Sequence, residues 1–495
     1  MILLSLLLLP LLAGALCLLA GQWARWLALL CMTACLLLGL QLLDGAQQAS
    51  AASPWIAEFA VDWIRRLGIR FHLAVDGLSL LLILLTALSG LVAVAASWKE
   101  IENRAGLFYA NLLWTLAGVM GIFLAQDLFL FFVCWEAMLV PMFLLINLWG
   151  HEGRLRASIK FFIFTQAGGL LLLTALLVLA SLYASQTGQW SFAYKDLLQT
   201  EISDRLAWWL LLGFVLGFAV KLPTFPLHPW LPDAHSQAST GGSVILAAIL
   251  LKTGAYGLIR FAVPLFPQAV EAMAPLAMSL GVASILYGAV LAFGQTDIKR
   301  LIACSSISHM GFVMLAVFAW NEWALQGAVM TLLAHGLSSA ALFMLAGAIY
   351  ARLHTRDMAV MGGLWRRMPA MAALAMFWTA ATVGLPGLSN FVGEFLVLLG
   401  SFQVSVAFTT VAALGMVGAA TYALLMMQRV FLGALPGEGP VAQAQLFDLD
   451  RREWLVFAGL AVLTVWLGIY PMAALQIAEP ALQSILLLAS QGGQP

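Results

Sequence analysis

The stretch that decides the fold is KLPTFPLHPWLPDAHSQASTGGSVILAAILLKTGAYGLIR, residues 221–260. Its first half carries prolines at short intervals, among them Pro223, Pro226 and Pro229. Since proline has no backbone N–H and its ring clashes with the preceding turn, a continuous helix cannot pass through this half. Its second half is an apolar run broken by Lys252, long enough to cross a bilayer. The stretch therefore predicts an interrupted membrane helix followed by one that carries a charge.

The rest of the chain has the same apolar character. Of 495 residues, 63% are hydrophobic and 9% charged, and the mean hydropathy is +0.98, which excludes a water-soluble globular fold. A spanning helix needs about 20 mostly apolar residues, and the sequence predicts an all-α membrane protein with about fourteen such spans. They are residues 2–20, 26–43, 76–97, 106–124, 127–148, 158–183, 206–231, 240–262, 272–294, 301–319, 323–350, 369–405, 407–430 and 453–473.

A second interruption lies in the twelfth predicted span. There TVGLPGLSNFVGEF places Pro386 and Gly387 inside an apolar segment, as the prolines do in the seventh span. Interrupted helices at matching places in two halves of a chain are typical of inverted repeats with ion sites at the breaks. We therefore predict two five-helix repeats, spans 4–8 (106–262) and spans 9–13 (263–430), in opposite orientations. The alternative is that the prolines only kink two membrane helices.

The two ends of the chain complete this division. Residues 1–105 hold the first three predicted helices and a loop, 44–75, that is too polar to span a membrane. No basic residue precedes the first apolar segment, so we interpret it as a retained helix and not as a signal peptide. Residues 431–495 hold helix 14 and a tail.

Basic residues predict the orientation, because Lys and Arg concentrate in cytoplasmic loops. With both termini outside, fifteen basic residues fall in inside loops and six in outside loops. The six are Arg65, Arg66, Arg70, Lys195, Arg205 and Arg260. This bias places both termini in the periplasm of a bacterium.

Four charged residues lie inside predicted spans, where a charge costs about 2.5–3.5 kcal/mol on insertion scales. They are Glu136, Lys221, Lys252 and Glu394. Burial disfavours the charged form of each group and a nearby opposite charge favours it, so two buried acids and two buried bases suit the loading and release of protons. Alternatives remain: lysines that extend to the head groups, and protonated glutamates that join helices by hydrogen bonds.

Histidines add candidate relay stations, because imidazole titrates nearest physiological pH. His309 and His335 lie in the tenth and eleventh spans and can serve as relays or as packing elements. His228 and His235 flank the seventh-span break, where they could instead cap freed backbone groups. A haem bound by His309 and His335 has no other support in the sequence.

Other classes of function find no signal. The net charge is zero, with 23 basic and 23 acidic residues, so no basic surface is available for nucleic acid. None of the five cysteines has the C-x-x-C spacing of zinc or iron–sulfur sites. We expect no metal, no cluster, no other cofactor and no disulfide framework, and we expect lipids and membrane proteins as partners.

At these residues the sequence resembles the antiporter-like subunits of the complex I membrane arm. The resemblance runs over most of the chain and includes FFVCWEAMLVPMF around Glu136, the stretch 221–260, DIKRLIACSSISHMG before the tenth span and GLPGLSNFVGEF with Glu394. It implies fourteen helices in two inverted repeats in the bacterial inner membrane, without a redox centre, next to other membrane-arm subunits.

The resemblance also implies roles for the buried residues. Glu136 is similar to the family's helix-five glutamate, which pairs with the helix-seven lysine, here Lys221. Lys252 matches the connecting lysine of helix eight, and Glu394 the terminal site of helix twelve. His309 and His335 match the polar axis between them.

From both lines of reasoning we expect a proton-translocating subunit driven by NADH:quinone oxidoreduction elsewhere in the complex. Protons are expected to enter from the cytoplasm near Lys221, to cross on Lys252 and the two histidines, and to leave from Glu394. Two other functions stay open: a subunit of an Mrp-type Na⁺/H⁺ antiporter, and a structural spacer whose buried charges serve only helix association.

Overall fold

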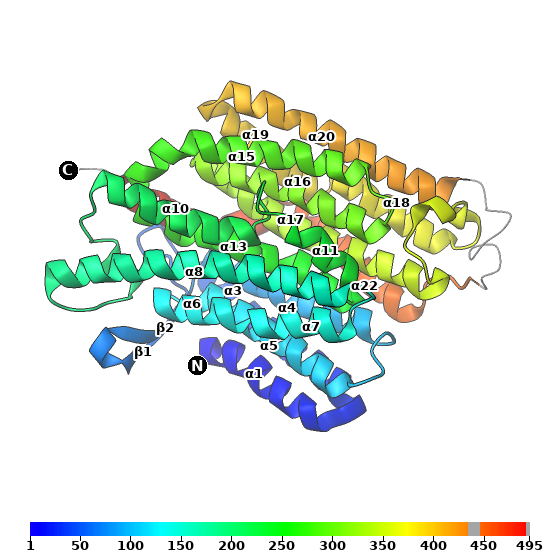
Figure 1. Ribbon diagram of the computed structural model, residues 1–495, viewed down its shortest axis with the longest axis horizontal. Coiled ribbons are helices and arrows are strands. Elements are labelled where there is room, and N and C mark those ends of the chain that lie inside the picture. Colours follow the sequence, from blue (N-terminus) through cyan, green and yellow to red (C-terminus); the bar gives the residue numbers. More distant parts are fainter. Residues whose placement is uncertain (434–445, 492–495) are drawn as a thin grey trace.

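The computed structural model describes residues 1–433 and 446–491, most of them in helices that run along the long axis of the molecule (Figure 1). These helices are α1 (Ile2–Ala20), α2 (Ala24–Gln41), α4 (Gly77–Ser97), α5 (Ala105–Leu124), α6 (Leu128–Ala137), α7 (Leu139–Trp149), α8 (Arg154–Thr187), α10 (Asp204–Lys221), α15 (Pro267–Phe293), α16 (Ile298–Ala319), α17 (Glu322–Leu353), α18 (Pro369–Val383), α19 (Ser389–Val404), α20 (Val406–Met427) and α22 (Arg451–Ile469). The shorter helices α11 (Trp230–Gln237), α12 (Thr240–Ile245), α13 (Leu251–Gly257) and α14 (Val263–Leu265) follow the first break.

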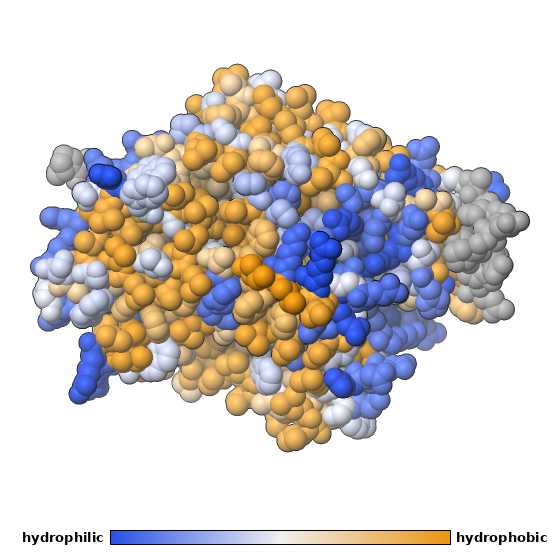
Figure 2. Space-filling view, viewed as in Figure 1, coloured by the Kyte–Doolittle hydropathy of each residue, from blue (hydrophilic) through white to orange (hydrophobic). Residues whose placement is uncertain are grey.

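The prediction of an all-helical, multi-pass membrane protein is confirmed. In the part of the chain that the structure describes, twelve helical stretches are long and apolar enough to cross a membrane, and α18 and α19 are shorter apolar helices. Hydrophobic side chains cover most of the left and middle of the face in Figure 2, and a hydrophilic region extends from the right-hand end toward the middle. The number fourteen and the inverted relation of the two five-helix units stay predictions.

Both predicted interruptions are present. α10 ends at Lys221 and α11 begins at Trp230, and the backbone groups freed between them find side-chain partners: the Trp230 indole donates to the Val220 carbonyl (2.8 Å), and the Ser284 hydroxyl accepts from the Phe225 N–H (2.8 Å). In the second break Gly387 has a φ of +94°, a conformation that side chains with a Cβ rarely adopt. The breaks therefore follow from proline and glycine, with neighbours satisfying the exposed backbone.

Aspartates begin several of the long helices. Asp76 accepts a hydrogen bond from the Ser79 N–H, Asp127 from Phe129 and Leu130, and Asp297 from the Arg300 N–H, each at 3.0 or 3.1 Å. The first N–H groups of a helix have no partner within the helix. A carboxylate that accepts hydrogen bonds from them therefore stabilises the beginning of the helix.

The loop predicted at 44–75 is more ordered than its polarity suggested. It contains strands β1 (Ala57–Ile64) and β2 (Ile69–Val75), which pair antiparallel with Ala57 opposite Val75. β2 covers the bundle, since residues 72–75 are buried, whereas β1 is largely exposed. Polarity excluded a spanning helix here, but it did not exclude a hairpin lying on the helix ends.

The predicted C-terminal tail is wrong for residues 472–491, which form a further helix, α23 (Met472–Gln491). α23 contacts α4, α14 and α17, and it meets α4 at Gly77, the first residue of that helix. A Cβ at Gly77 would meet the Ile477 carbonyl, so this close approach requires glycine. Gln476, Glu479 and Pro480 interrupt the apolar run, and hydropathy alone therefore did not reveal the helix.

One of the six basic residues predicted to lie in outside loops, Arg260, does not lie in a loop. Arg260 lies within the helical segment 258–262, 3% exposed, and its guanidinium forms an ion pair with buried Asp76. It is therefore not an outside-loop cation, and removing it from the outside group strengthens the bias of basic residues toward the other end.

Candidate functional site

Lys252 lies at the centre of the bundle, on α13, and is completely buried. Its ammonium donates to the Ala247 carbonyl (2.6 Å) and lies 2.7 Å from Nδ1 of His335 on α17. Ala247 belongs to a π-helical turn, residues 246–250. In such a turn the backbone is wider and its hydrogen bonds reach one residue further, an irregularity frequent at functional sites. The local backbone thus positions the amine toward α17.

His335 and His309 continue the polar line. His335 is 3% exposed, and its Nδ1 accepts a hydrogen bond when the Lys252 amine is charged, which leaves the ring proton on Nε2. The ring of His309, on α16, has its centroid 5.7 Å from that of His335. The two imidazoles are neighbours without a direct hydrogen bond between them.

His309 contacts Glu394, which begins the second turn of α19 behind the break. The Nδ1 of His309 lies 2.6 Å from Oε1 of Glu394, and both side chains are at most 4% exposed. An ionised carboxylate can only accept, so Nδ1 carries the proton in this contact. The structure therefore brings together four of the six predicted residues, in the order Lys252, His335, His309, Glu394.

Tyr422, on α20, completes this group and was not predicted from the sequence. Its hydroxyl lies 3.0 Å from Nε2 of His309, and the side chain is 1% exposed. Since Nδ1 faces the carboxylate, the tyrosine O–H donates to Nε2 of a neutral His309 and fixes its tautomer. The available signal was a phenol within the apolar span 407–430, which holds one of the chain's eight tyrosines.

Lys221 and Glu136 form a separate pair of neighbours. Lys221, 1% exposed, ends α10 with its ammonium 5.4 Å from the ring centroid of Trp135 and 5.5 Å from that of Phe161. Such an arrangement stabilises a desolvated cation. Among the described residues the amine has no hydrogen-bond partner, and no ion pair within 4.0 Å joins it to Glu136. The expected contact between the two charges is therefore not formed here, although Trp135 precedes Glu136 directly.

Glu136, on α6, is partly exposed on the side of α8. One carboxylate oxygen, Oε1, is buried without a hydrogen-bond partner in the described chain, and Gln166 interacts with the carboxylate. The Oε1 atom of Glu136 can therefore still accept a hydrogen bond, and it lies near Lys221. α10 packs against α13, so the Lys221 group and the Lys252 group lie on adjoining helices.

The two histidines at the first break both lie against aromatic rings. Both ring nitrogens of His235 are buried without a partner in the described residues, and the ring stacks on Phe343 with centroids 4.4 Å apart. His235 therefore caps no freed backbone group. His228 packs against Phe225 and Tyr287, and its Nδ1 has no partner either.

No metal or haem arrangement is present among the described side chains. Residues 1–433 and 446–491 contain no group of three or more His, Cys, Asp or Glu that could hold a metal ion. The ring nitrogens of His309 and the Nδ1 of His335 already contact protein groups.

Comparisons with known proteins show the family to which the chain is related. The family model described as "NADH:quinone oxidoreductase/Mrp antiporter, TM" matches residues 125–420. The chain is 51% identical to NADH-quinone oxidoreductase subunit M of Pseudomonas aeruginosa, covering 98% of this chain and 97% of the relative. It is 50% identical to the subunit of that name in Escherichia coli (strain K12), covering 97% and 96%.

Two solved structures have the same fold. A chain of respiratory complex I from Thermus thermophilus with bound NADH superposes with a TM-score of 0.87 at 34% identity, and all of both chains is covered. A chain of the Mrp complex from Dietzia sp. gives a TM-score of 0.82 at 24% identity, covering 99% of this chain and 51% of that one, which shows a shared fold alone.

Proposed function

The chain belongs to the NADH:quinone oxidoreductase/Mrp antiporter family of membrane proteins, and from this premise we propose that it moves protons from the cytoplasm to the periplasm as a subunit of respiratory complex I. It is an antiporter-like membrane subunit related to NADH-quinone oxidoreductase subunit M. Its neighbours are other subunits of the membrane arm, and its host is the bacterial inner membrane.

The observation that carries the proposal is the line of contacts from Lys252 to Glu394. A proton on the Lys252 amine can pass to Nδ1 of His335 over 2.7 Å, leaving a neutral amine and an imidazolium. His309 can pass a proton to Glu394 over 2.6 Å. Since Nδ1 of His309 faces Glu394, a proton from His335 must arrive at Nε2, through a bridging water molecule that takes the place of the Tyr422 hydroxyl there. The line connects helices of both five-helix units, as a path across the chain requires.

Uptake is assigned to the Lys221 and Glu136 region and release to Glu394. The cation over two aromatic rings, with an unpaired carboxylate oxygen nearby, can rearrange when a proton arrives. Electrons do not pass through this chain, and it needs no cofactor of its own. Quinone reduction elsewhere supplies the energy, which must exceed about 2.3 kcal/mol per proton for each 100 mV of opposing potential.

A test of the relay uses Glu394→Gln, which keeps the size of the side chain and removes its ability to accept a proton. We expect the assembled complex to lose most NADH-driven proton pumping in membrane vesicles. Tyr422→Phe, which leaves the carboxylate in place, is expected to retain more pumping than Glu394→Gln. Glu322→Gln, an exposed carboxylate on α17, serves as the matched control and should pump normally.

The two other functions give different results in the same vesicles. A structural spacer predicts near-normal pumping by Glu394→Gln, since glutamine preserves packing. A subunit of an Na⁺/H⁺ antiporter predicts proton movement driven by an Na⁺ gradient without NADH. Either result would remove the proposed relay.

The orientation makes a separate prediction. Met1 and α23 lie at the same end of the bundle (Figure 1), and the basic residues favour the opposite end for the cytoplasm. Alkaline phosphatase fused to the C-terminus should therefore be active, because it folds in the periplasm. A fusion at the loop between α7 and α8 should be inactive. Activity at that loop and none at the C-terminus would reverse the assignment.

A further inference from the structure

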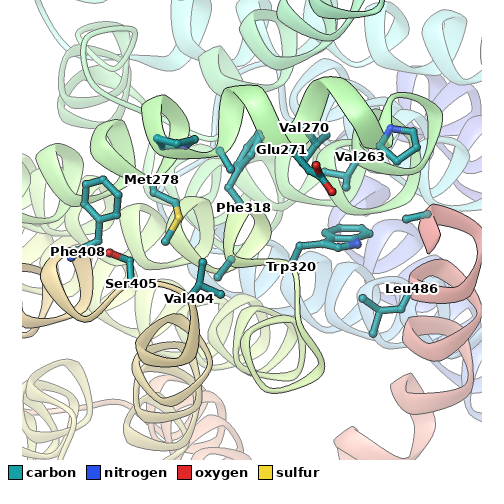
Figure 3. A pocket seen from close by; sticks show the side chains of 15 residues that line it. Val263, Val270, Glu271, Met278, Phe318, Trp320, Val404, Ser405, Phe408 and Leu486 are labelled. Atoms are coloured by element: carbon teal, nitrogen blue, oxygen red, sulfur yellow. Dashed lines mark hydrogen bonds between the residues drawn. The ribbon is translucent and has the colours of Figure 1, made fainter. Parts of the chain in front are cut away.

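An apolar cavity lies apart from the relay, at the end of the bundle where α15 begins and α16 ends (Figure 3). Its volume is about 680 Å³. Its walls are apolar and come from α15, α16, α19, α20 and α23, which contribute Met278, Phe318, Val404, Phe408 and Leu486 in that order. No residue of the proton relay lines it.

Among the described residues that line the cavity, Glu271 carries the one charged side chain. It lies four residues after Pro267, at the start of α15, and its side chain is exposed. Within residues 1–433 and 446–491 it has no ion pair and no side-chain hydrogen bond. An unpaired carboxylate therefore stands beside an apolar hollow.

The depth of these side chains follows from the length of α15. Its 27 residues extend about 40 Å, longer than the hydrocarbon core of about 30 Å, so its first turns reach head-group level. Met278, seven residues beyond Glu271, lies about 10 Å deeper along the helix. Trp320 also lines the cavity near Glu271, as Figure 3 shows, and tryptophan favours the membrane interface.

We propose that the cavity binds one phospholipid, with an acyl chain between Met278 and Phe318 and its ethanolamine ammonium on Glu271. An acyl chain removes the apolar walls from water and fills the hollow that helix packing leaves. A primary ammonium donates charge-assisted hydrogen bonds to a carboxylate, which a choline head group cannot do. Trp320 adds an indole N–H to the cavity wall near Glu271.

This site is independent of the proposed function, and lipid retention tests it directly. The assembled complex is placed in nanodiscs of phosphatidylcholine containing isotope-labelled phosphatidylethanolamine, washed with detergent, and analysed for bound lipid by mass spectrometry. Glu271→Gln removes the carboxylate that pairs with the ethanolamine ammonium, which should lower retention about threefold to fivefold, the effect of losing an exposed ion pair. Glu322→Gln, an exposed carboxylate at the same end of the bundle, should retain the wild-type amount.

A second variant tests the cavity without changing charge. Met278→Trp fills the space of the acyl chain and should also release the lipid, while both variants keep normal proton pumping. Equal retention of labelled phosphatidylethanolamine by wild type and Glu271→Gln would overturn the proposal. So would a parallel experiment in which the wild type retains labelled phosphatidylcholine as well as it retains labelled phosphatidylethanolamine. A segment of a neighbouring subunit seated in the cavity would overturn it as well.

Discussion

Replacing Lys252 with methionine is expected to lower NADH-driven proton pumping by about two orders of magnitude, the scale of a lost proton-transfer group. Methionine keeps the length and apolar stem of lysine and removes the amine that contacts His335 and the Ala247 carbonyl. The proton then has no carrier between α10 and the histidines. The measurement is the pH gradient formed by membrane vesicles on NADH addition, normalised to assembled complex.

Lys299→Met is the matched control, because Lys299 is also a buried lysine, 2% exposed. Its ammonium donates to the Ala238 carbonyl, outside the line from Lys252 to Glu394. If pumping fell equally in both variants, removal of any buried ammonium would explain the loss. The assignment of Lys252 to the relay would then fail.

The largest effect on stability is expected at the ion pair between Arg260 and Asp76. Both side chains are buried, and the Arg260 guanidinium lies 5.4 Å from the ring centroid of Trp55 and 5.6 Å from that of Tyr256. Arg260→Met leaves the Asp76 carboxylate buried without its cation, which should lower the free energy of unfolding by about 3–5 kcal/mol. The measurement is thermal unfolding of the purified complex, together with the fraction of chain that assembles.

A double variant separates charge from packing in this prediction. Asp76→Asn with Arg260→Met removes both charges and keeps a side chain that can cap α4, so it should be more stable than Arg260→Met alone. Arg205→Met, at an exposed arginine, should change stability by less than about 0.5 kcal/mol. A double variant as unstable as the single one would show that methionine does not fit the site.

For each of these variants, the measured activity is divided by the amount of assembled complex. Variants of the proton relay and variants of the Arg260–Asp76 ion pair are expected to differ in how well they assemble. A Lys252 variant that assembles and does not pump identifies a functional residue, whereas an Arg260 variant that fails to assemble identifies a structural one.

The sequence by itself determined the membrane class, the helical character, the two breaks and the six charged or histidine residues of the candidate site. These features depend on local chemistry. Apolar length sets a span, proline and glycine interrupt it, and a charge in an apolar segment stands out wherever it lies. The β1–β2 hairpin and α23 were not predicted, because their residues are only partly apolar. Both elements are stabilised by packing against the ends of other helices, which a local sequence pattern does not show.

The tertiary structure alone decided which of those residues touch. Lys252 and His335 are 83 residues apart in the chain, His309 and Glu394 85, and His309 and Tyr422 113. It also showed Lys221 over aromatic rings without an ion pair to Glu136. Spacing within one helix fixes which neighbours share a face, but the pairing of side chains from different helices depends on how those helices pack, which no local pattern contains.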